Sequence, residues 1–220
     1  NTTHYRVDSV REWVMENVVE PETVSGHMWR MAVACMALSD DDLGGADATR
    51  CAKITLVHDL AEAIVGDITP HCGVSKEEKL KLEESALKSI TKDLDPRTAE
   101  EIFNLWREFE DGLTLEAQVA SDLDALDMIL QADEYERDQG LELESFFTST
   151  KDKMKTDVGR RLQRELVAQR KKRIEITNTQ DTNEIPNVAN TQDTNEIPNV
   201  ANTQDTNEIP NVANTQDTNE

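Results

Sequence analysis

The spacing of apolar side chains constrains this fold most strongly, because it follows a helical period along most of the chain. Residues 7–19 carry apolar side chains three or four positions apart, which places them on one face of a helix. Similar patterns predict helices at about 23–38, 47–65, 75–92, 98–110, 115–137 and 156–172, with a short apolar element at 141–147. No segment alternates apolar and polar residues as a strand between hairpin turns would. We therefore predict an all-α bundle.

Capping residues set the expected helix boundaries. Either Thr23 or Ser25 can cap the second helix, which runs into a polar loop at residues 39–45. Asp47 is expected to cap a third helix that continues through residue 65. Because this third helix is apolar on most sides, we place it at the centre of the domain.

The end of the chain is a repeat of the twelve-residue unit NTQDTNEIPNVA, which fills residues 178–220. Each copy offers only isoleucine and valine as sizeable apolar groups, too little to offset the entropy lost on ordering. We expect this tail to be disordered; stacking of the copies into a solenoid is the alternative. Residues 1–177 then form one domain, long enough to bury a core.

The chain is strongly acidic, with a formal net charge of −22. Eight acidic residues and no basic ones lie in the repeat, so residues 1–177 retain about −14. Such a surface repels nucleic acid polymers and anionic membranes, so we expect neither as a partner. A phosphate-bearing substrate would need a local cation, which a bound metal can supply.

Cysteine usage and hydropathy bear on the compartment. The three cysteines show no C-x-x-C spacing, which is typical of idle thiols in a reducing environment rather than of a disulfide framework. No apolar run approaches the length of a membrane span, and the sequence opens on polar residues. We expect a cytoplasmic protein.

His58 and Asp59 lie side by side in the apolar segment TLVHDLAEAIVGD, where an unpaired charge is costly. On a helix their side chains would diverge by about 100° and approach one ion from neighbouring faces. Glu62 follows one turn later over the same patch, and Asp67 follows Gly66, where a turn can bring it back towards the helix end. A simple His–Asp hydrogen bond, with both later acids in solvent, is the alternative.

Two further polar residues have apolar neighbours, His27 in VSGHMWRMAV and Asp124 in LDALDMILQ. A lone histidine on an apolar face is more often a core residue. Periodicity alone favours Asp122 or Asp127 almost as well as Asp124. The residues themselves therefore indicate a polar centre at the His-Asp pair without fixing its other members.

The order His, His-Asp, Asp, carried by VSGHMWRMAV, LVHDLAEAIVGDITP and LDMILQADEYE, resembles the HD-domain superfamily and, more closely, its 5′-deoxynucleotidase family. The resemblance covers about residues 10–172, although an N-terminal helix expected of the family is missing. It implies an HD-domain helical bundle and a metal-dependent phosphohydrolase. It also implies that the substrate is a small nucleotide, a (deoxy)ribonucleoside 5′-monophosphate, which is hydrolysed to nucleoside and phosphate. The resemblance further implies a homodimer.

The resemblance also assigns roles to single residues. The metal ligands it implies are His27, His58, Asp59 and Asp124. Glu62 would activate the attacking water, and Asp67 would act beside it and contact the substrate near the sugar and the scissile phosphate. Arg11 and Trp13 are candidates for substrate binding, with an ordinary core position as the alternative for Trp13. The ligand set suits Co²⁺ or Mn²⁺, with Zn²⁺ and Mg²⁺ as alternatives.

Several positions depart from the family pattern. Gly26 replaces an acidic residue before the first metal histidine, which we interpret as the loss of a group that supports metal binding. Glu16 stands where relatives tend to carry a basic residue. The mixed-charge helix face formed by Lys76, Lys79 and Lys81 is interpreted as solvated surface. Two other functions stay open at this point: an HD-type hydrolase of a phosphodiester or guanosine polyphosphate, and a diverged binding module that uses the acidic repeat tail.

Overall fold

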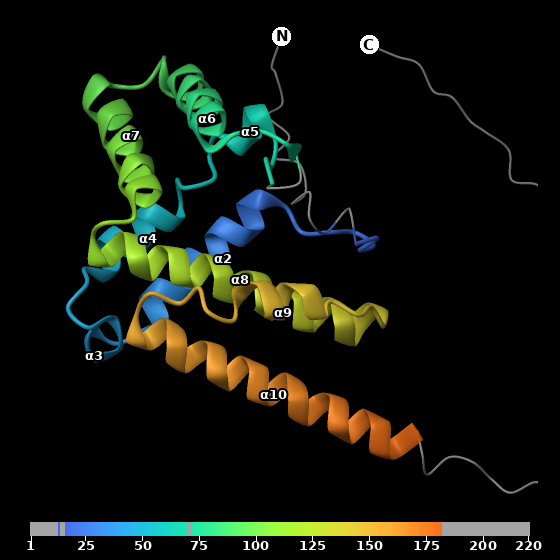
Figure 1. Cartoon of the computed structure of the whole chain (residues 1–220). Coiled ribbons are helices and arrows are strands. Elements are labelled where there is room, and N and C mark those ends of the chain that lie inside the picture. The colour runs from blue at the N-terminus through green and yellow to red at the C-terminus, as the bar shows by residue number, and fades with distance from the viewer. Residues whose placement is uncertain (1–12, 14–15, 70–71, 182–220) are drawn as a thin grey trace, which may run out of the picture.

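The computed structural model describes residues 13, 16–69 and 72–181, with side chains up to residue 177. The regular elements in this part of the chain are all helices, which confirms the predicted fold class. They are α2 (Val24–Ala37), α3 (Asp40–Leu43), α4 (Ala48–Thr55), α5 (Glu62–Val65), α6 (Lys76–Thr91), α7 (Pro96–Asp111), α8 (Leu115–Gln139), α9 (Glu144–Thr150) and α10 (Asp157–Asp181). In Figure 1, α8 crosses the middle of the molecule, between the α6–α7 pair and α10.

The central helix is α8, not the predicted helix at 47–65. Buried apolar residues recur every three or four positions along α8, and the face that they form packs against α2, α4 and α9. The buried residues of that face are Val119, Leu123, Leu126, Ile129 and Ala132. In contrast, Leu56 and Ile64, which we expected to be internal, are exposed. The domain is therefore built around residues 115–139.

The helix predicted at 47–65 is interrupted in the segment that holds the His-Asp pair. α4 ends at Thr55, and α5 begins only at Glu62. The Thr55 carbonyl lies 2.9 Å from His58 Nδ1, so the imidazole takes the acceptor that a continuing α-helix would use. The following amides, including that of Glu62 to the Asp59 carbonyl, bond three residues back, as in a tighter 3₁₀ turn.

The predicted loop at 39–45 also differs from the structure, because it contains α3. Ser39 caps this helix, and Asp42 bonds back to the Ser39 amide, which completes a capping box. A second difference lies before α2. The helix predicted at 7–19 falls mostly outside the described residues, but it cannot continue through Asn17, whose φ of 60° is left-handed. The Val18 amide donates to the Trp13 carbonyl, the bond typical of a helix C-terminus.

Other local predictions are confirmed. Thr23, rather than Ser25, caps α2 by accepting a hydrogen bond of 3.1 Å from the Gly26 amide. Asp47 caps α4 by accepting from the Thr49 amide at 2.8 Å. Each of these bonds joins residues two or three positions apart, so it depends little on the rest of the fold.

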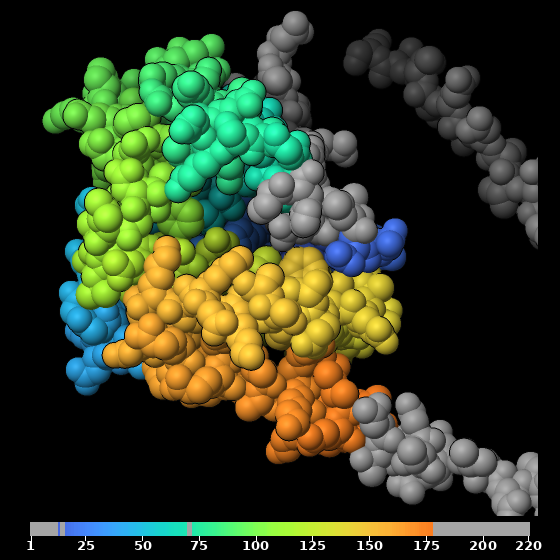
Figure 2. All heavy atoms as spheres, viewed as in Figure 1, coloured from blue at the N-terminus to red at the C-terminus, as the bar shows by residue number. Residues whose placement is uncertain are grey.

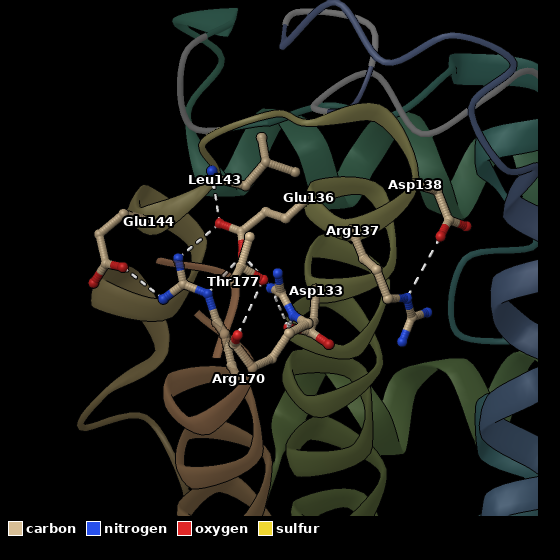
Figure 3. A network of polar contacts seen from close by, with 9 residues as sticks. Asp133, Glu136, Arg137, Asp138, Leu143, Glu144, Arg170 and Thr177 are labelled. Atoms are coloured by element: carbon tan, nitrogen blue, oxygen red, sulfur yellow. Dashed lines mark hydrogen bonds and ion pairs between the residues drawn. The ribbon is translucent and has the colours of Figure 1, made fainter. Parts of the chain in front are cut away.

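The last helix is held by a network of arginines and acids (Figure 3). Arg170 donates to Glu136 of α8 and to Glu144 of α9, and its guanidinium lies 3.9 Å from the centre of the Phe147 ring. Arg173 pairs with Asp133. α10 runs to Asp181, past the predicted end at 172, so the first four residues of the repeat are helical. The remainder of the repeat lies outside the described residues.

Candidate metal centre and adjoining cavity

The fold brings the four predicted metal ligands together. His27 lies in the first turns of α2, His58 and Asp59 in the turn between α4 and α5, and Asp124 in the middle of α8. His27 Nε2 is 3.2 Å from Asp124 Oδ1 and 3.8 Å from Asp59 Oδ2. His58 Nε2 is 3.0 Å from the same Asp59 oxygen. Donor atoms of His27, His58 and Asp59 all lie within 4.8 Å of one another, and Asp124 joins this cluster through its contact with His27.

The hydrogen bond of His58 fixes its tautomer. Its Nδ1 faces the Thr55 carbonyl, which can only accept, so Nδ1 carries the proton and Nε2 presents a lone pair. Nε2 is buried and makes no regular hydrogen bond to the described part of the chain, although Asp59 Oδ2 lies 3.0 Å away. A buried lone pair without a donor is costly, and a cation would satisfy it. The donor atoms therefore fit a divalent metal ion.

His27 is oriented by Asp127, a residue that the predicted site did not include. Asp127 Oδ2 lies 2.7 Å from His27 Nδ1, and Arg30 donates two further hydrogen bonds to the same carboxylate. Burial raises the pKa of Asp127, but the hydrogen bonds from His27 and Arg30 outweigh it and hold the pKa below its ordinary value. The ionised carboxylate keeps the proton on Nδ1 and leaves Nε2 facing Asp59 and Asp124.

This arrangement supports His27 without an acidic residue at position 26, and the effect of Gly26 on metal affinity stays a prediction. The carboxylate that supports His27 comes from α8, one helical turn after Asp124, and not from the position before His27. Gly26 lies in the first turn of α2, and its amide is already satisfied by the Thr23 hydroxyl. The glycine therefore leaves the orientation of the histidine intact.

The third acid of this part of α8 has a different task. Asp122 accepts from the amides of Lys155 and Thr156, at 2.8 and 2.7 Å, and from the Thr156 hydroxyl. It anchors the segment that leads into α10. A Cβ on Gly159 would lie 2.2 Å from Asp122 Oδ2, so only glycine fits there. Periodicity had left the three α8 acids nearly equivalent, whereas their contacts separate them.

Three of the four side chains, those of His27, Asp59 and Asp124, border a cavity of about 500 Å³, and His58 lies buried behind them. Figure 2 shows this side of the molecule, with α6 and α9 on either side of a recess. Carboxyl groups dominate the lining: Glu16, Glu22, Asp59, Glu62, Asp67 and Asp124. Trp13, Met128 and Phe146 contribute apolar surface, and Lys79 and Lys153 contribute ammonium groups. The cavity thus offers room for a small molecule beside the metal ligands.

Glu62 is buried at the start of α5 and lines this cavity. Burial, reinforced by the charges of Asp59 and Asp67, raises its pKa to about 10. At His27, burial lowers the pKa, but Asp124 and Asp127 reverse this and raise it to about 11. So many carboxyl groups in one place favour positive charge, supplied either by protons or by a metal ion.

The predicted substrate-binding residues differ in where the structure places them. Trp13 is 1% exposed, packs on Tyr135 and Phe146, and donates from Nε1 to Glu22 at 3.0 Å. It is a core residue that also borders the cavity. Arg11 lies outside the described residues. Asp67 lines the cavity, and its contact with a substrate stays a prediction.

The three lysines predicted to form a solvated face on α6 differ in their exposure. Lys76 and Lys81 are exposed, in agreement with the prediction. Lys79 is only about one-third exposed, at 34% of its side chain, and lines the cavity. The solvated-surface interpretation is wrong for this residue, because the packing of α6 turns it towards the site.

Two histidine nitrogens, two carboxylates and a buried glutamate beside a polar cavity are a donor set that a metal-dependent hydrolase can use, and the relatives of this chain identify it as a metal-dependent phosphohydrolase. The chain belongs to the HD domain family, whose model matches residues 8–165. It is 43% identical over 169 residues to the 5′-deoxynucleotidase HDDC2 of Dictyostelium discoideum, a match that covers 72% of this chain and 89% of that protein. It is 46% identical over 140 residues to the human 5′-deoxynucleotidase HDDC2, covering 63% and 67%.

Solved structures share the fold. A conserved hypothetical protein from Pyrococcus furiosus superposes with a TM-score of 0.59 at 31% identity, covering 76% of this chain and 93% of that one. A predicted metal-dependent phosphohydrolase from Magnetospirillum magnetotacticum gives a TM-score of 0.57 at 23% identity, covering 77% and 87%. In the part of the chain that the structure describes, no helix combines the length and the apolar character that a membrane crossing requires.

Proposed function

We propose that this chain is a metal-dependent 5′-nucleotidase that hydrolyses (deoxy)ribonucleoside 5′-monophosphates to nucleoside and phosphate. The observation that carries the proposal is that His27, Asp59 and Asp124 lie at the edge of a cavity that Glu62 also lines, with the buried His58 in contact with Asp59. The 5′-deoxynucleotidase relatives support the substrate class, because they align over most of the domain.

The four side chains are the proposed metal ligands. Two imidazoles and two carboxylates, with water completing the shell, suit Co²⁺ or Mn²⁺, and Zn²⁺ and Mg²⁺ are the alternatives. A divalent ion bound there lowers the pKa of water and polarises a phosphoryl oxygen. The unpartnered Nε2 of His58 and the Nδ1 bond from His27 to Asp127 support this assignment, since in the neutral form of each imidazole they leave Nε2 as the nitrogen that can bind a metal ion.

Two acids of the cavity take the remaining proposed roles. Glu62 is the proposed acceptor for the proton of the attacking water. Burial and the charges of Asp59 and Asp67 raise its pKa in the metal-free chain, and a divalent ion held beside Asp59 would lower that pKa and leave the carboxylate free to accept the proton. Asp67 contacts the sugar and the scissile phosphate, acting beside Glu62. The apolar wall formed by Trp13, Met128 and Phe146 is the proposed contact for the nucleoside.

Phosphate release tests the proposal directly. The protein is incubated with Co²⁺ or Mn²⁺ and a panel of deoxyribo- and ribonucleoside 5′-monophosphates, with a phosphodiester and a guanosine polyphosphate as further substrates. Release from the monophosphates is expected. Asp124→Asn should abolish it, whereas Asp138→Asn, on the same helix but with 69% of its side chain exposed, should leave it unchanged. No release from any monophosphate by metal-loaded protein refutes the proposal.

The organisation of the whole chain is also proposed. Residues 1–177 form the catalytic domain, and residues 178–220 form a tail that does not take part in catalysis. The enzyme is proposed to act in the cytoplasm as a homodimer. Light scattering of the purified protein and cell fractionation test these points, and a monomer that is fully active contradicts the dimer.

A further inference from the structure

The charge balance of the cavity requires more positive charge than one metal ion provides. Its described lining holds six carboxyl groups but only two lysines. A nucleoside monophosphate would add about two negative charges at neutral pH. One divalent ion is balanced by its two carboxylate ligands alone. An additional cation close to the ligands is therefore needed to hold the phosphate.

Lys79 is the described cation best placed for this task. It lies on α6, lines the cavity, and has 34% of its side chain exposed. Burial lowers its pKa, but the charges of Glu83, Asp59 and Glu110 outweigh this and raise it, so the group stays an ammonium. Lys79 shares the cavity wall with Asp59, a proposed metal ligand, and with Glu62, the proposed base.

The pairing of Lys79 with Glu83 does not occupy the whole ammonium group. Ion pairs four residues apart on a helix usually lie in solvent and contribute little. Here Glu83 is 5% exposed, and its Oε1 lies 3.4 Å from Lys79 Nζ, longer than a good hydrogen bond. An ammonium group has three donors, so this contact leaves others for a ligand in the cavity. The buried glutamate fixes the lysine at the wall.

The second lysine of the cavity is less suited. Lys153 is exposed and lies in the turn that follows α9. Solvent and salt screen such a charge strongly. A partly buried charge close to the metal ligands acts on the phosphate with less screening.

We propose that Lys79 is a substrate-binding residue whose ammonium group donates hydrogen bonds to the phosphate held beside His27, Asp59 and Asp124. This inference rests on the proposed function and names the side-chain cation that binds the phosphate of the proposed substrate. It gives the chain a phosphate ligand on α6, where the sequence pattern had indicated only surface.

The test uses the full chain loaded with Mn²⁺ and inorganic phosphate as the probe. Calorimetry measures phosphate affinity and, separately, Mn²⁺ affinity, while steady-state kinetics gives KM and kcat for a deoxynucleoside monophosphate. Lys79→Met should weaken phosphate binding and raise KM by roughly 10- to 100-fold, the worth of a charge-assisted hydrogen bond. Mn²⁺ affinity should change by less than about 3-fold, since a metal ligand would lose far more. Lys79→Arg should restore part of the phosphate affinity.

The control is Lys81→Met, which removes an exposed lysine from the same helix and should change neither affinity. If Lys79→Met folds poorly because Glu83 loses its partner, the double variant with Glu83→Gln removes both charges and should show the same loss of phosphate binding. Unchanged phosphate affinity in either variant overturns the inference, as does a loss that merely follows weaker Mn²⁺ binding.

The outcomes separate the two proposals. If the wild-type protein cleaves no nucleotide but binds phosphate through Lys79, the proposed function fails and the assignment of Lys79 stands. If the wild-type protein is active and Lys79→Met matches it in KM and phosphate affinity, only the assignment fails.

Discussion

Replacing Asp127 by asparagine should weaken metal binding although Asp127 is not a proposed ligand. The carboxylate accepts hydrogen bonds from His27 Nδ1 and from two nitrogens of Arg30. Asparagine offers one acceptor oxygen and one NH₂ group. The charged guanidinium competes more strongly for that oxygen, so the NH₂ group is left facing the histidine. His27 then moves its proton to Nε2, the nitrogen that faces Asp59 and Asp124.

The expected decrease in metal affinity follows from the loss of one correctly oriented histidine ligand. Disrupting a carboxylate–histidine–metal pair typically costs 10- to 100-fold in metal affinity, or about 1.4–2.8 kcal/mol. Mn²⁺ affinity is measured by calorimetry at neutral pH, together with thermal unfolding of the metal-free protein. Asp122→Asn is the matched control, because it makes the same change at a buried acid of the same helix that holds backbone amides. It should lower stability without a specific loss of Mn²⁺ affinity.

The refuting result is equally specific. If Asp127→Asn binds Mn²⁺ as tightly as the wild-type protein while Asp124→Asn does not, then Asp127 does not set the tautomer of His27. A loss of equal size in Asp122→Asn would show that the effect comes from general destabilisation of α8.

Three further predictions concern stability. Gly26→Asp places an acid in the first turn of α2, which has none, but its Cβ would lie 3.3 Å from the capping Thr23 Oγ1 and press on it. The net gain in a urea titration should therefore stay below about 1 kcal/mol, with Mn²⁺ affinity retained; a loss of affinity would contradict the structural account. Gly159→Ala should destabilise by roughly 2–4 kcal/mol because its Cβ displaces Asp122, and a neutral result would refute that clash. At Glu136, burial raises the pKa, but hydrogen bonds from Arg170 and the Leu143 amide lower it below 4.5. Its stabilisation is therefore present above that pH and lost below it, so the stability gap between wild type and Glu136→Gln should narrow in acid.

The helix caps show what the sequence determines by itself. Thr23 and Asp47 each satisfy an amide two or three residues away, so the local order of residues is enough to place the start of a helix. Apolar periodicity likewise predicted the all-α class and the extent of α8, because both depend on contacts between neighbouring turns.

The interruption at the His-Asp pair shows where local reasoning fails. Periodicity predicted one helix through residue 65, because an apolar run gives no sign that His58 will take the Thr55 carbonyl. Lys79 is a similar case. Its charged neighbours on α6 predicted surface, and only the packing of that helix beside α5 and α7 turns it to the cavity.

The three acids of α8 show most clearly what the sequence determines and what only the tertiary structure decides. The sequence order, through its resemblance to HD-domain proteins, predicted Asp124 with His27, His58 and Asp59, and the fold brings those four together. Asp124 contacts Nε2 of His27, and Asp127 contacts Nδ1. Only the packing of α2 against α8 decides this assignment. Positions three residues apart share a helix face, so sequence spacing cannot separate Asp124 from Asp127. The position of the imidazole between them, set by contacts 97 and 100 residues apart in sequence, gives each acid its role.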